Sequence, residues 1–346
     1  MRILITGIAG FTGSTIARNI AMTCHENEIF GIDNLSRNGS ERNVKMLKDL
    51  DIDFYHGDIR NKEDLDCLPD ADWVIDCAAE PSVLAGIDGN GPSKLIGNNL
   101  IGTLNLLEWC RTRKAGFILL STSRVYSINA LNDISLTSDN DRFITTWPNN
   151  EYGVNHKFST KSPISLYGGT KLSSETMAME YHHAFDIPVF INRCGVIAGP
   201  GQFGKIDQGI ISYWIYQWMK RKPLKYIGFG GKGHQVRDFI SPVDVCALII
   251  EQIDDPDNPA KITNIGGGIE NSISLRELSM WCEKKFGYSN EVIESDEERP
   301  FDIPYYVTDN SHAYSNWDWK VRNSKESILN SIYEFAIRNE DFVLDI

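Results

Sequence analysis

The chain has 346 residues, 42% of them hydrophobic, so it is long enough to bury a large core in one large domain or two closely joined domains. It carries 34 lysines and arginines against 47 aspartates and glutamates, a formal net charge of −13. This balance argues against nucleic acid or an anionic membrane as the main partner, and an anionic ligand would have to meet locally placed basic side chains.

The seven cysteines are scattered without close pairing, and several stand in apolar runs: Cys24, Cys67, Cys77, Cys110, Cys194, Cys246 and Cys282. This pattern is typical of reduced, mostly buried thiols in a cytoplasmic protein, and no His/Cys/Asp cluster offers a metal site. Met1 and Arg2 lead directly into an apolar strand, and no run of about eighteen apolar residues follows. We therefore expect a cytoplasmic protein with neither a secretion signal nor a membrane span.

The N-terminal stretch has the pattern of a strand, a glycine turn and a helix. Residues 2–5 are apolar, and a helical pattern runs from 14 to 22. Three glycines between them permit a tight turn, close approach of the backbone to a pyrophosphate, and close packing of helix on strand. A tight turn alone would also use glycines, but the position between strand and helix predicts a dinucleotide-binding loop of Gly7, Gly10, Phe11, Thr12 and Gly13.

The second strand, 29–33, ends in Asp33, about 20 residues after the last glycine, as the dinucleotide fingerprint requires. A carboxylate there would bind the ribose hydroxyls and repel a 2′-phosphate, so the sequence predicts NAD as the cofactor. Arg37 follows closely, and an arginine there would instead favour NADP. A third strand, 53–56, leads into a turn where Asp58 and Ile59 would flank an adenine, with an ordinary solvated turn as the alternative.

Two further buried strands end at the same edge of the predicted sheet. The strand at 73–77 is followed by a turn that lets the backbone lie against a cofactor, formed by Ala78, Ala79 and Glu80. The strand at 117–120 is followed by three hydroxyl side chains, Ser121, Thr122 and Ser123. Since ligands bind at the carboxyl edge of a parallel sheet, these hydroxyls favour a site over surface caps. Between the two strands, residues 92–113 predict one long amphipathic helix.

The helix that begins near Ser165 carries Tyr167 and Lys171 four residues apart, on one face. Lowering a tyrosine pKa of about 10 by roughly three units requires about 4 kcal/mol. An ammonium at about 4 Å, at an effective dielectric near 20, supplies an interaction of that size. Tyr167 would then exchange a proton with a substrate hydroxyl that Thr122 orients, while Lys171 binds a ribose. Alone the pair is a weak signal; with the glycine turn and Asp33 it predicts hydride transfer to NAD.

Strands and helices alternate over the first 190 residues, which predicts an α/β fold: a Rossmann doubly wound parallel sheet with a smaller, interleaved C-terminal substrate-binding lobe. We assign 1–193 and 236–268 to the NAD-binding domain, and 194–235 and 269–346 to the substrate-binding lobe. The short strand at 235–240 would return to the main sheet.

A long polar stretch, 127–163, interrupts this alternation as an irregular insertion. Loops of this length in compact domains are usually functional lids or mobile surface segments. We favour a lid over the substrate, which includes the polar residues at 149–152 and 155–157.

Together, these motifs resemble the extended short-chain dehydrogenase/reductase family of nucleotide-sugar epimerases and dehydratases. The resemblance rests on the glycine turn, Asp33, Asn99, Thr122 and the Tyr167/Lys171 pair, and it covers nearly the whole chain. It is specific for the superfamily and much less so for the substrate. It implies an NAD-dependent enzyme that acts on a nucleotide-diphosphate sugar, with Asn99 at the cofactor, and a homodimer or higher homo-oligomer formed through the helix from 92 and the Tyr167 helix.

Within that family, 4,6-dehydratases carry an Asp-Glu pair directly after the threonine, whereas this chain has Ser123 and Arg124, which disfavours dehydration. Many 4-epimerases have an asparagine where this chain has Val196. The chain resembles the subgroup of CDP-paratose (CDP-tyvelose) 2-epimerases in 33–37, in 202–209 and in 233–238. Leu166 stands where a proline is usual in that subgroup, and Asp76 stands where a histidine is common.

The resemblance to this subgroup implies oxidation at C2, turning of the keto sugar, and return of hydride to its other face. It places Asn34, Ser36 and Arg37 at the cofactor. Arg237 and Arg299 would pair with the diphosphate, where charge-assisted bonds are strongest, or they would be ordinary surface salt bridges. The segment 202–209 would wrap the nucleotide, so the expected substrate-binding residues are Ser123, Arg124, Gln202, Phe203, Gln208, Gly209, Arg237 and Arg299.

Two other functions stay open at this point. One is a UDP-sugar 4-epimerase or another sugar-nucleotide oxidoreductase. The other is a catalytically silent NAD-binding sensor or scaffold, against which the intact Thr122, Tyr167 and Lys171 count.

Overall fold

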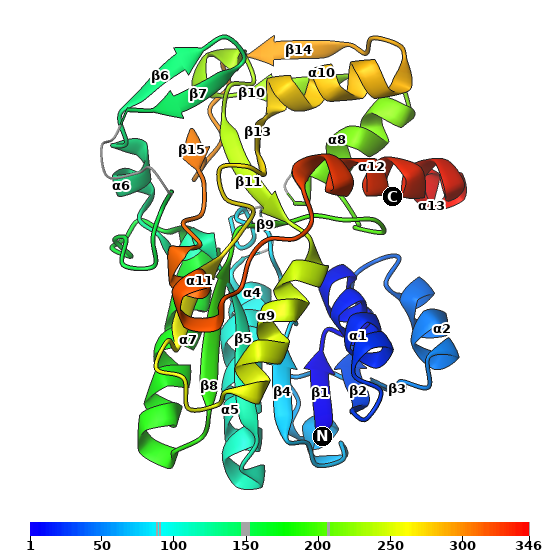
Figure 1. Ribbon diagram of the computed structural model, residues 1–346, viewed down its shortest axis with the longest axis vertical. Helices are drawn as coiled ribbons and strands as arrows, with labels where there is room; N and C mark the ends of the chain where they lie inside the picture. The colour runs from blue at the N-terminus through cyan, green and yellow to red at the C-terminus, as the bar shows by residue number, and fades with distance from the viewer. Residues whose placement is uncertain (88, 90, 147–152, 206–207, 346) are drawn as a thin grey trace.

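The structure, a computed structural model, describes residues 1–87, 89, 91–146, 153–205 and 208–345. Figure 1 shows a lower domain of vertical strands flanked by helices, and a smaller upper lobe. Seven strands of the described chain form the lower sheet, and every pair in it is parallel. They are β1 (Arg2–Thr6), β2 (Glu28–Asp33), β3 (Asp53–His56), β4 (Trp73–Asp76), β5 (Gly116–Thr122), β8 (Val189–Cys194) and β12 (Ile262–Ile265).

The strand order is β12-β8-β5-β4-β1-β2-β3, so the chain runs outward from β1 in one direction and then in the other. This doubly wound order confirms the predicted Rossmann-type fold. Its topological switch point lies between β1 and β4, and ligands of such sheets bind in the crevice beyond the carboxyl ends of the strands there.

Helices cover both faces of the sheet, and alternation along each strand separates the two cores. Ile3 and Ile5 of β1 pack with one set of helices, and Leu4 between them packs with the other. Figure 1 shows α1 and α9 in front of the sheet. The first set is α1 (Phe11–Thr23), α2 (Glu41–Asp49) and α9 (Pro242–Asp254), and the second is α3 (Lys62–Asp66), α5 (Gly102–Arg113) and α7 (Ser165–Phe185).

The segment 92–113, predicted as one long helix, forms a continuous helix from Ser93 to Arg113 that is interrupted by a π-helical turn. It consists of α4 (Ser93–Ile96), the turn η1 (Gly97–Ile101) and α5. The extra residue in such a turn rotates the side chains beyond it, and it directs Asn99 into the interior, where its exposure is 0%.

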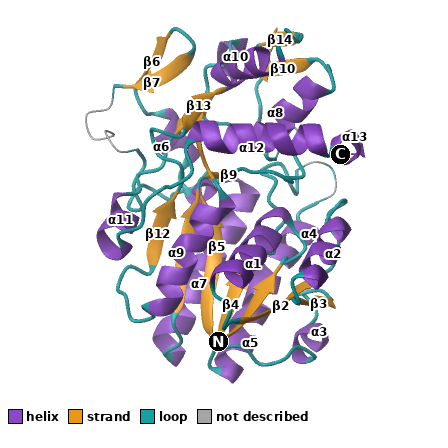
Figure 2. Cartoon of the chain, turned by 45° about the vertical axis from the view of Figure 1, so that its right-hand side comes forward, coloured by secondary structure: helices purple, strands orange, loops and turns teal. Residues whose placement is uncertain are grey.

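The upper lobe packs helices against short strands, as Figure 2 shows from another side. Its core is rich in aromatic residues, including Trp214, Trp218 and Tyr226. The elements are β9 (Val196–Ile197), α8 (Ile210–Met219), β10 (Leu224–Ile227), β11 (Val236–Ile240), β13 (Ser272–Ser274), α10 (Leu275–Phe286), β14 (Val292–Ser295), β15 (Tyr305–Tyr306), α12 (Lys325–Arg338) and α13 (Glu340–Asp345).

The structure places two segments, β11 and 311–319, differently from the sequence-based prediction. β11 does not return to the main sheet; it pairs with β9, β13 and β15, because β12 occupies the position beside β8. The segment at 311–319 was assigned to the lobe, yet α11 (Ser311–Trp317) packs beside β12, with Trp317 and Trp319 in the core of the lower domain. The division into two domains otherwise stays a prediction.

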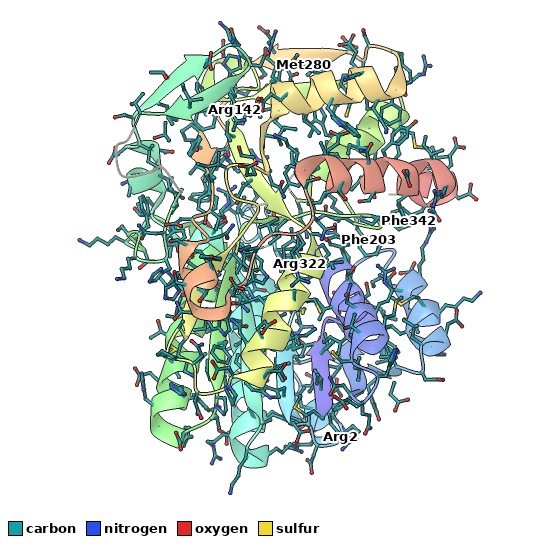
Figure 3. The ribbon with its side chains drawn as sticks, viewed as in Figure 1. Arg2, Arg142, Phe203, Met280, Arg322 and Phe342 are labelled. Carbon is teal, nitrogen blue, oxygen red and sulfur yellow. The ribbon has the colours of Figure 1, made fainter. Side chains whose placement is uncertain are left out.

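The insertion at 127–163 is more ordered than expected. It contains α6 (Ile128–Asn132) and a hairpin of β6 (Leu136–Asp139) and β7 (Arg142–Thr145). The hairpin packs on the lobe: Arg142, labelled in Figure 3, donates to Ser272 Oγ at 2.6 Å and forms an ion pair with Glu277. The part of the insertion that the structure describes contributes no residue to the ligand cleft, contrary to the lid interpretation; residues 149–152 lie outside the described residues.

All seven cysteines are free, and four of them are buried. Over the described ranges, no helix has both the length and the apolar character needed to cross a bilayer.

Candidate active site

A cleft of about 600 Å³ lies between the lower domain and the upper lobe, beyond the carboxyl ends of β1, β2, β4, β5 and β8. Its walls include the glycine turn and Asp33, and three arginines, Arg124, Arg237 and Arg299. Thr122 and Tyr167 line the same cleft. A single cavity therefore contains most residues that the sequence singled out.

The glycine turn leaves no room for side chains. Gly7 has a φ of +61°, and a Cβ on it would come within 3.0 Å of Ala78 Cα. A Cβ on Gly13 would lie 2.3 Å from the carbonyl oxygen of Gly7. α1 then begins at Phe11 with no side-chain cap and no acidic residue in its first turn. Its N–H groups and the positive end of its dipole are therefore available to an anion such as a pyrophosphate.

Asp33 lies at the end of β2, where its carboxylate accepts backbone N–H bonds from Ala9 at 3.0 Å and Leu35 at 2.8 Å. Burial raises the pKa of this carboxyl, and the backbone hydrogen bonds oppose that rise. These bonds fix the carboxylate beside the glycine turn, where a ribose hydroxyl pair would lie. The position fits NAD.

Arg37 has partners in the segment after β9. Its guanidinium donates to the carbonyl oxygen of Phe203, and to Gln208 Oε1 at 2.9 Å. It therefore joins the region after β2 to the lobe, whereas the sequence left open that it would meet a 2′-phosphate. Asn34 and Ser36 also line the cleft.

The expected adenine end is organised around Asp58. Its carboxylate accepts from Arg60 at 2.6 Å and from Asn34 Nδ2 at 2.9 Å. The charged hydrogen bond from Arg60 holds the pKa of Asp58 well below its usual range. Ile59 is buried next to Gly102 of α5, and both Asp58 and Ile59 line the cleft.

Tyr167 and Thr122 form the centre of the cleft. Tyr167 is 7% exposed, and burial raises the pKa of its phenol to about 12, although a hydrogen bond from Thr122 opposes the rise. Lys171 is fully buried and donates from Nζ to the carbonyl oxygen of Leu120 at 2.9 Å. Burial therefore dominates the pKa of this phenol, contrary to the expectation of a phenol acidified by its lysine, because the cost of burying a phenolate exceeds the stabilisation that its neighbours provide.

Asn99, which the resemblance places at the cofactor, is fully buried and lies outside the lining of the cleft. Its side-chain amide accepts from Glu80 N at 2.7 Å and donates to Glu80 O at 3.0 Å, and its own carbonyl accepts from Ser174. The π-helical turn accounts for this inward position. Asn99 thereby fixes the strand end from 78 to 80, whose three residues do line the cleft.

Three arginines, Arg124, Arg237 and Arg299, lie near one another in the cleft wall. Arg237 forms an ion pair with Asp302 at 2.9 Å, and Arg124 donates to the carbonyl oxygen of Phe301 at 3.2 Å. Burial lowers the pKa of both, that of Arg237 to about 10, and the positive charge of Arg299 lowers both further. An anion bound among them would relieve this repulsion.

The segment at 202–209 closes one side of the cleft. Gln202 donates to Ile197 O at 2.8 Å and accepts from Ser212 Oγ at 2.8 Å, which fixes the start of the segment. Figure 3 shows Phe203 close to Phe342, and their ring centroids lie 5.6 Å apart. Gln202, Phe203, Gln208 and Gly209 line the cleft, as does Ser123; residues 206 and 207 lie outside the described residues.

Sequence reasoning missed several lining residues, among them Lys94, Asn98, Gln235, Phe301 and Asp302. One feature of the sequence could have identified Asp302 as a cleft residue: it follows Arg299, a predicted substrate-binding residue, by three positions. Gln235 lies in the segment 233–238 that carries the resemblance to the subgroup. The other three belong to no motif, because they reach the cleft only through the packing of the lobe, of α4 and of η1.

Comparisons with known proteins point to one enzyme family. The model of the "NAD dependent epimerase/dehydratase family" matches residues 3–266. CDP-paratose 2-epimerase of Salmonella typhi is 29% identical over 97% of this chain and 99% of its own length. UDP-glucuronate 4-epimerase of Thermodesulfobacterium geofontis is 27% identical over 82% of this chain and 80% of its own length.

Among solved structures, UDP-glucuronic acid 4-epimerase from Bacillus cereus, crystallised with UDP-glucuronic acid and NAD, matches with a TM-score of 0.78 and 26% identity, over 98% of this chain and 99% of its own. A dTDP-glucose 4,6-dehydratase from Bacillus anthracis shares the fold, with a TM-score of 0.76 over 99% of this chain and 98% of its own at 24% identity. Because the family model matches well over half of the chain, the protein belongs to the NAD-dependent epimerase/dehydratase family and is an NAD-dependent enzyme.

Proposed function

We propose that the protein is an epimerase of a nucleotide-diphosphate sugar, of the CDP-paratose/CDP-tyvelose 2-epimerase kind. The observation that carries the proposal is that one cleft contains the glycine turn after β1, the hydroxyls of Thr122 and Tyr167, and the arginine cluster. Thr122 ends β5, two strands away from β1 in the sheet, and Arg124 follows it by two residues. A diphosphate held by the arginines would bring its sugar to Tyr167. The similarity to CDP-paratose 2-epimerase over nearly the full length of both chains supports a CDP-sugar.

The residues present fit NAD. Backbone N–H groups at the start of α1 would bind its pyrophosphate, Asp33 its ribose hydroxyls, and Asp58 with Ile59 its adenine. When bound, NAD would supply a hydride acceptor and the positive charge of its nicotinamide ring. Thr122 and Tyr167 would hold the oxygen of the sugar hydroxyl. Because burial raises the pKa of Tyr167 to about 12, that positive charge would have to lower it before Tyr167, as a phenolate, takes the hydroxyl proton while the carbinol becomes a ketone.

Inversion then requires the sugar to turn while the diphosphate stays bound. The carbonyl carbon of the keto sugar is planar, so it can accept hydride on either face. Arg124, Arg237 and Arg299 hold the diphosphate during this movement, and Tyr167 returns its proton to the oxygen as the second face is reduced. No oxidant is consumed, because each cycle restores the starting redox state.

The nearest rival is a UDP-sugar 4-epimerase, which the match to the Bacillus cereus structure favours. To separate the two, purified protein is incubated with CDP-, UDP- and GDP-sugars, and NMR locates the inverted carbon. Inversion at C2 of a CDP-sugar is the expected result. Inversion at C4 of a UDP-sugar would replace the proposal with its rival, and no turnover of any of these sugars would reject both.

We also propose a homodimer formed through α4, η1, α5 and α7. Large apolar side chains are exposed along these elements, at 38–47% of their surface for Ile96, Ile101, Leu166 and Phe185. A second copy would cover them. Light scattering that finds only monomer would exclude this assembly.

The free cysteines support the expected location of the protein in the reducing cytoplasm.

A further inference from the structure

A buried ion pair lies beneath the reaction centre and takes no part in the chemistry described so far. Glu175 of α7 and Arg193 of β8 are joined by three hydrogen bonds, the shortest 2.7 Å from Arg193 Nη2 to Glu175 Oε2. Their side chains are 2% and 7% exposed. Pairs this deep pay a large desolvation cost, so they are weak evidence for a purely stabilising role.

A third group joins the pair. Ser121 Oγ donates to Glu175 Oε1 at 2.5 Å, and Ser121 lies directly opposite Arg193 in the register of β5 and β8. Ser121 immediately precedes Thr122. Glu175 follows Lys171 by one helical turn, on the face of α7 that carries Tyr167. The carboxylate thus connects α7 to the ends of the two strands that support the reacting hydroxyls.

The start of α7 is held by one local side-chain hydrogen bond. Gly168 N donates to Ser165 Oγ at 3.2 Å, whereas Ile164 provides no side-chain cap, and Ser165 has a φ of +66°. The position of Tyr167, two residues after Ser165, therefore also depends on contacts deeper along the helix. Lys171 to Leu120 O is one such contact, and Glu175 is the next.

We infer that Ser121, Glu175 and Arg193 form a positioning triad, which sets the Tyr167 hydroxyl against Thr122 by fixing α7 on the ends of β5 and β8. This inference rests on the proposed epimerase chemistry. Arg193 extends the connection, because its Nη1 donates to His156 O at 3.0 Å and approaches the Tyr126 hydroxyl at 3.4 Å.

The decisive variant is the double substitution Glu175→Met with Arg193→Met, which removes both charges together and leaves no unpaired ion in the interior. We expect it to fold and to bind NAD and substrate within about threefold of wild type. Its kcat should fall about 10- to 100-fold with KM little changed, since small misplacement of a reacting group costs that much. A kcat equal to that of wild type in the folded variant would overturn the inference.

A milder variant keeps the test valid if the double variant does not fold. Ser121→Ala leaves the ion pair intact and removes one bond to the carboxylate, so kcat should fall by a few-fold, while an unchanged kcat would count against the triad. The matched control is Gln252→Met. It breaks the equally buried pair between Asn192 of β8 and Gln252 of α9, with bonds of 2.8 and 2.9 Å, and should lower stability without changing kcat.

Crystal structures of Ser121→Ala and of the double variant separate this inference from the proposed function. The triad predicts a longer distance from Thr122 Oγ1 to Tyr167 Oη than in wild type, and an unchanged distance in both would refute it. If wild type turns over no nucleotide sugar, the proposed function fails, and this distance alone decides the inference.

Discussion

Lys171 donates from its buried ammonium to the carbonyl oxygen of Leu120 at 2.9 Å, two residues before Thr122. The lysine therefore supports the end of β5 as well as belonging to the reactive helix. We predict that Lys171→Met lowers the free energy of unfolding by about 1–3 kcal/mol, because a buried carbonyl loses its donor. Urea unfolding measures this, and a variant as stable as wild type would show that the hydrogen bond contributes nothing.

Tyr167→Phe should abolish most turnover while sparing the cofactor. The substitution removes only the hydroxyl, so the rate should fall by at least about 10²-fold, the contribution expected of a positioned acid or base. NAD affinity, measured by fluorescence titration, should change less than threefold. The control is Tyr226→Phe, whose buried hydroxyl contacts Ser279 at 2.7 Å in the lobe, away from the cleft. Wild-type turnover by Tyr167→Phe would refute the assignment.

The same phenol should make stability fall at high pH. Its pKa is about 12 in the folded chain, against about 10 when unfolded. Between these values the folded state holds a proton that the unfolded state has lost, so this contribution is full below pH 10 and disappears as pH rises toward 12. It amounts to about 3 kcal/mol. Tyr167→Phe should therefore lose less stability than wild type between pH 9 and 12, and parallel losses would contradict the raised pKa.

Asp33→Asn tests the choice of cofactor. Removing the carboxylate takes away an acceptor for the ribose hydroxyls and the charge that repels a 2′-phosphate, so NAD should bind about tenfold more weakly. The gap between NAD and NADP affinity should narrow. Titration of both cofactors measures it, with the exposed Asp53→Asn as control. An unchanged preference would show that Asp33 does not select the cofactor.

Arg237→Met tests the arginine cluster. It removes one of the charge-assisted partners proposed for the diphosphate, so KM for the nucleotide sugar should rise about 10- to 100-fold, with a smaller change in kcat. Asp302 loses its ion-pair partner as well, so stability must be measured in parallel. The exposed Arg338→Met is the control. An unchanged KM would remove Arg237 from the proposed diphosphate site.

Local patterns in the sequence were sufficient for the main frame of this protein. The strand, glycine turn and helix at the N-terminus, the strand that ends at Asp33, and the helix with Tyr167 and Lys171 all have a recognisable periodicity or spacing. The Rossmann-type sheet followed from their alternation. Such features are encoded within about one element of chain, so they can be predicted without knowing what packs against them.

Tertiary structure alone decided what each of these side chains contacts. Lys171 of α7 donates to a carbonyl oxygen of β5. Asn99 turns inward through a π-helical turn, and burial raises the pKa of Tyr167. Three arginines from different segments meet only because the lobe folds over the sheet. The physical reason is that burial and long-range contacts depend on how elements pack together, and no local pattern of residues records that packing.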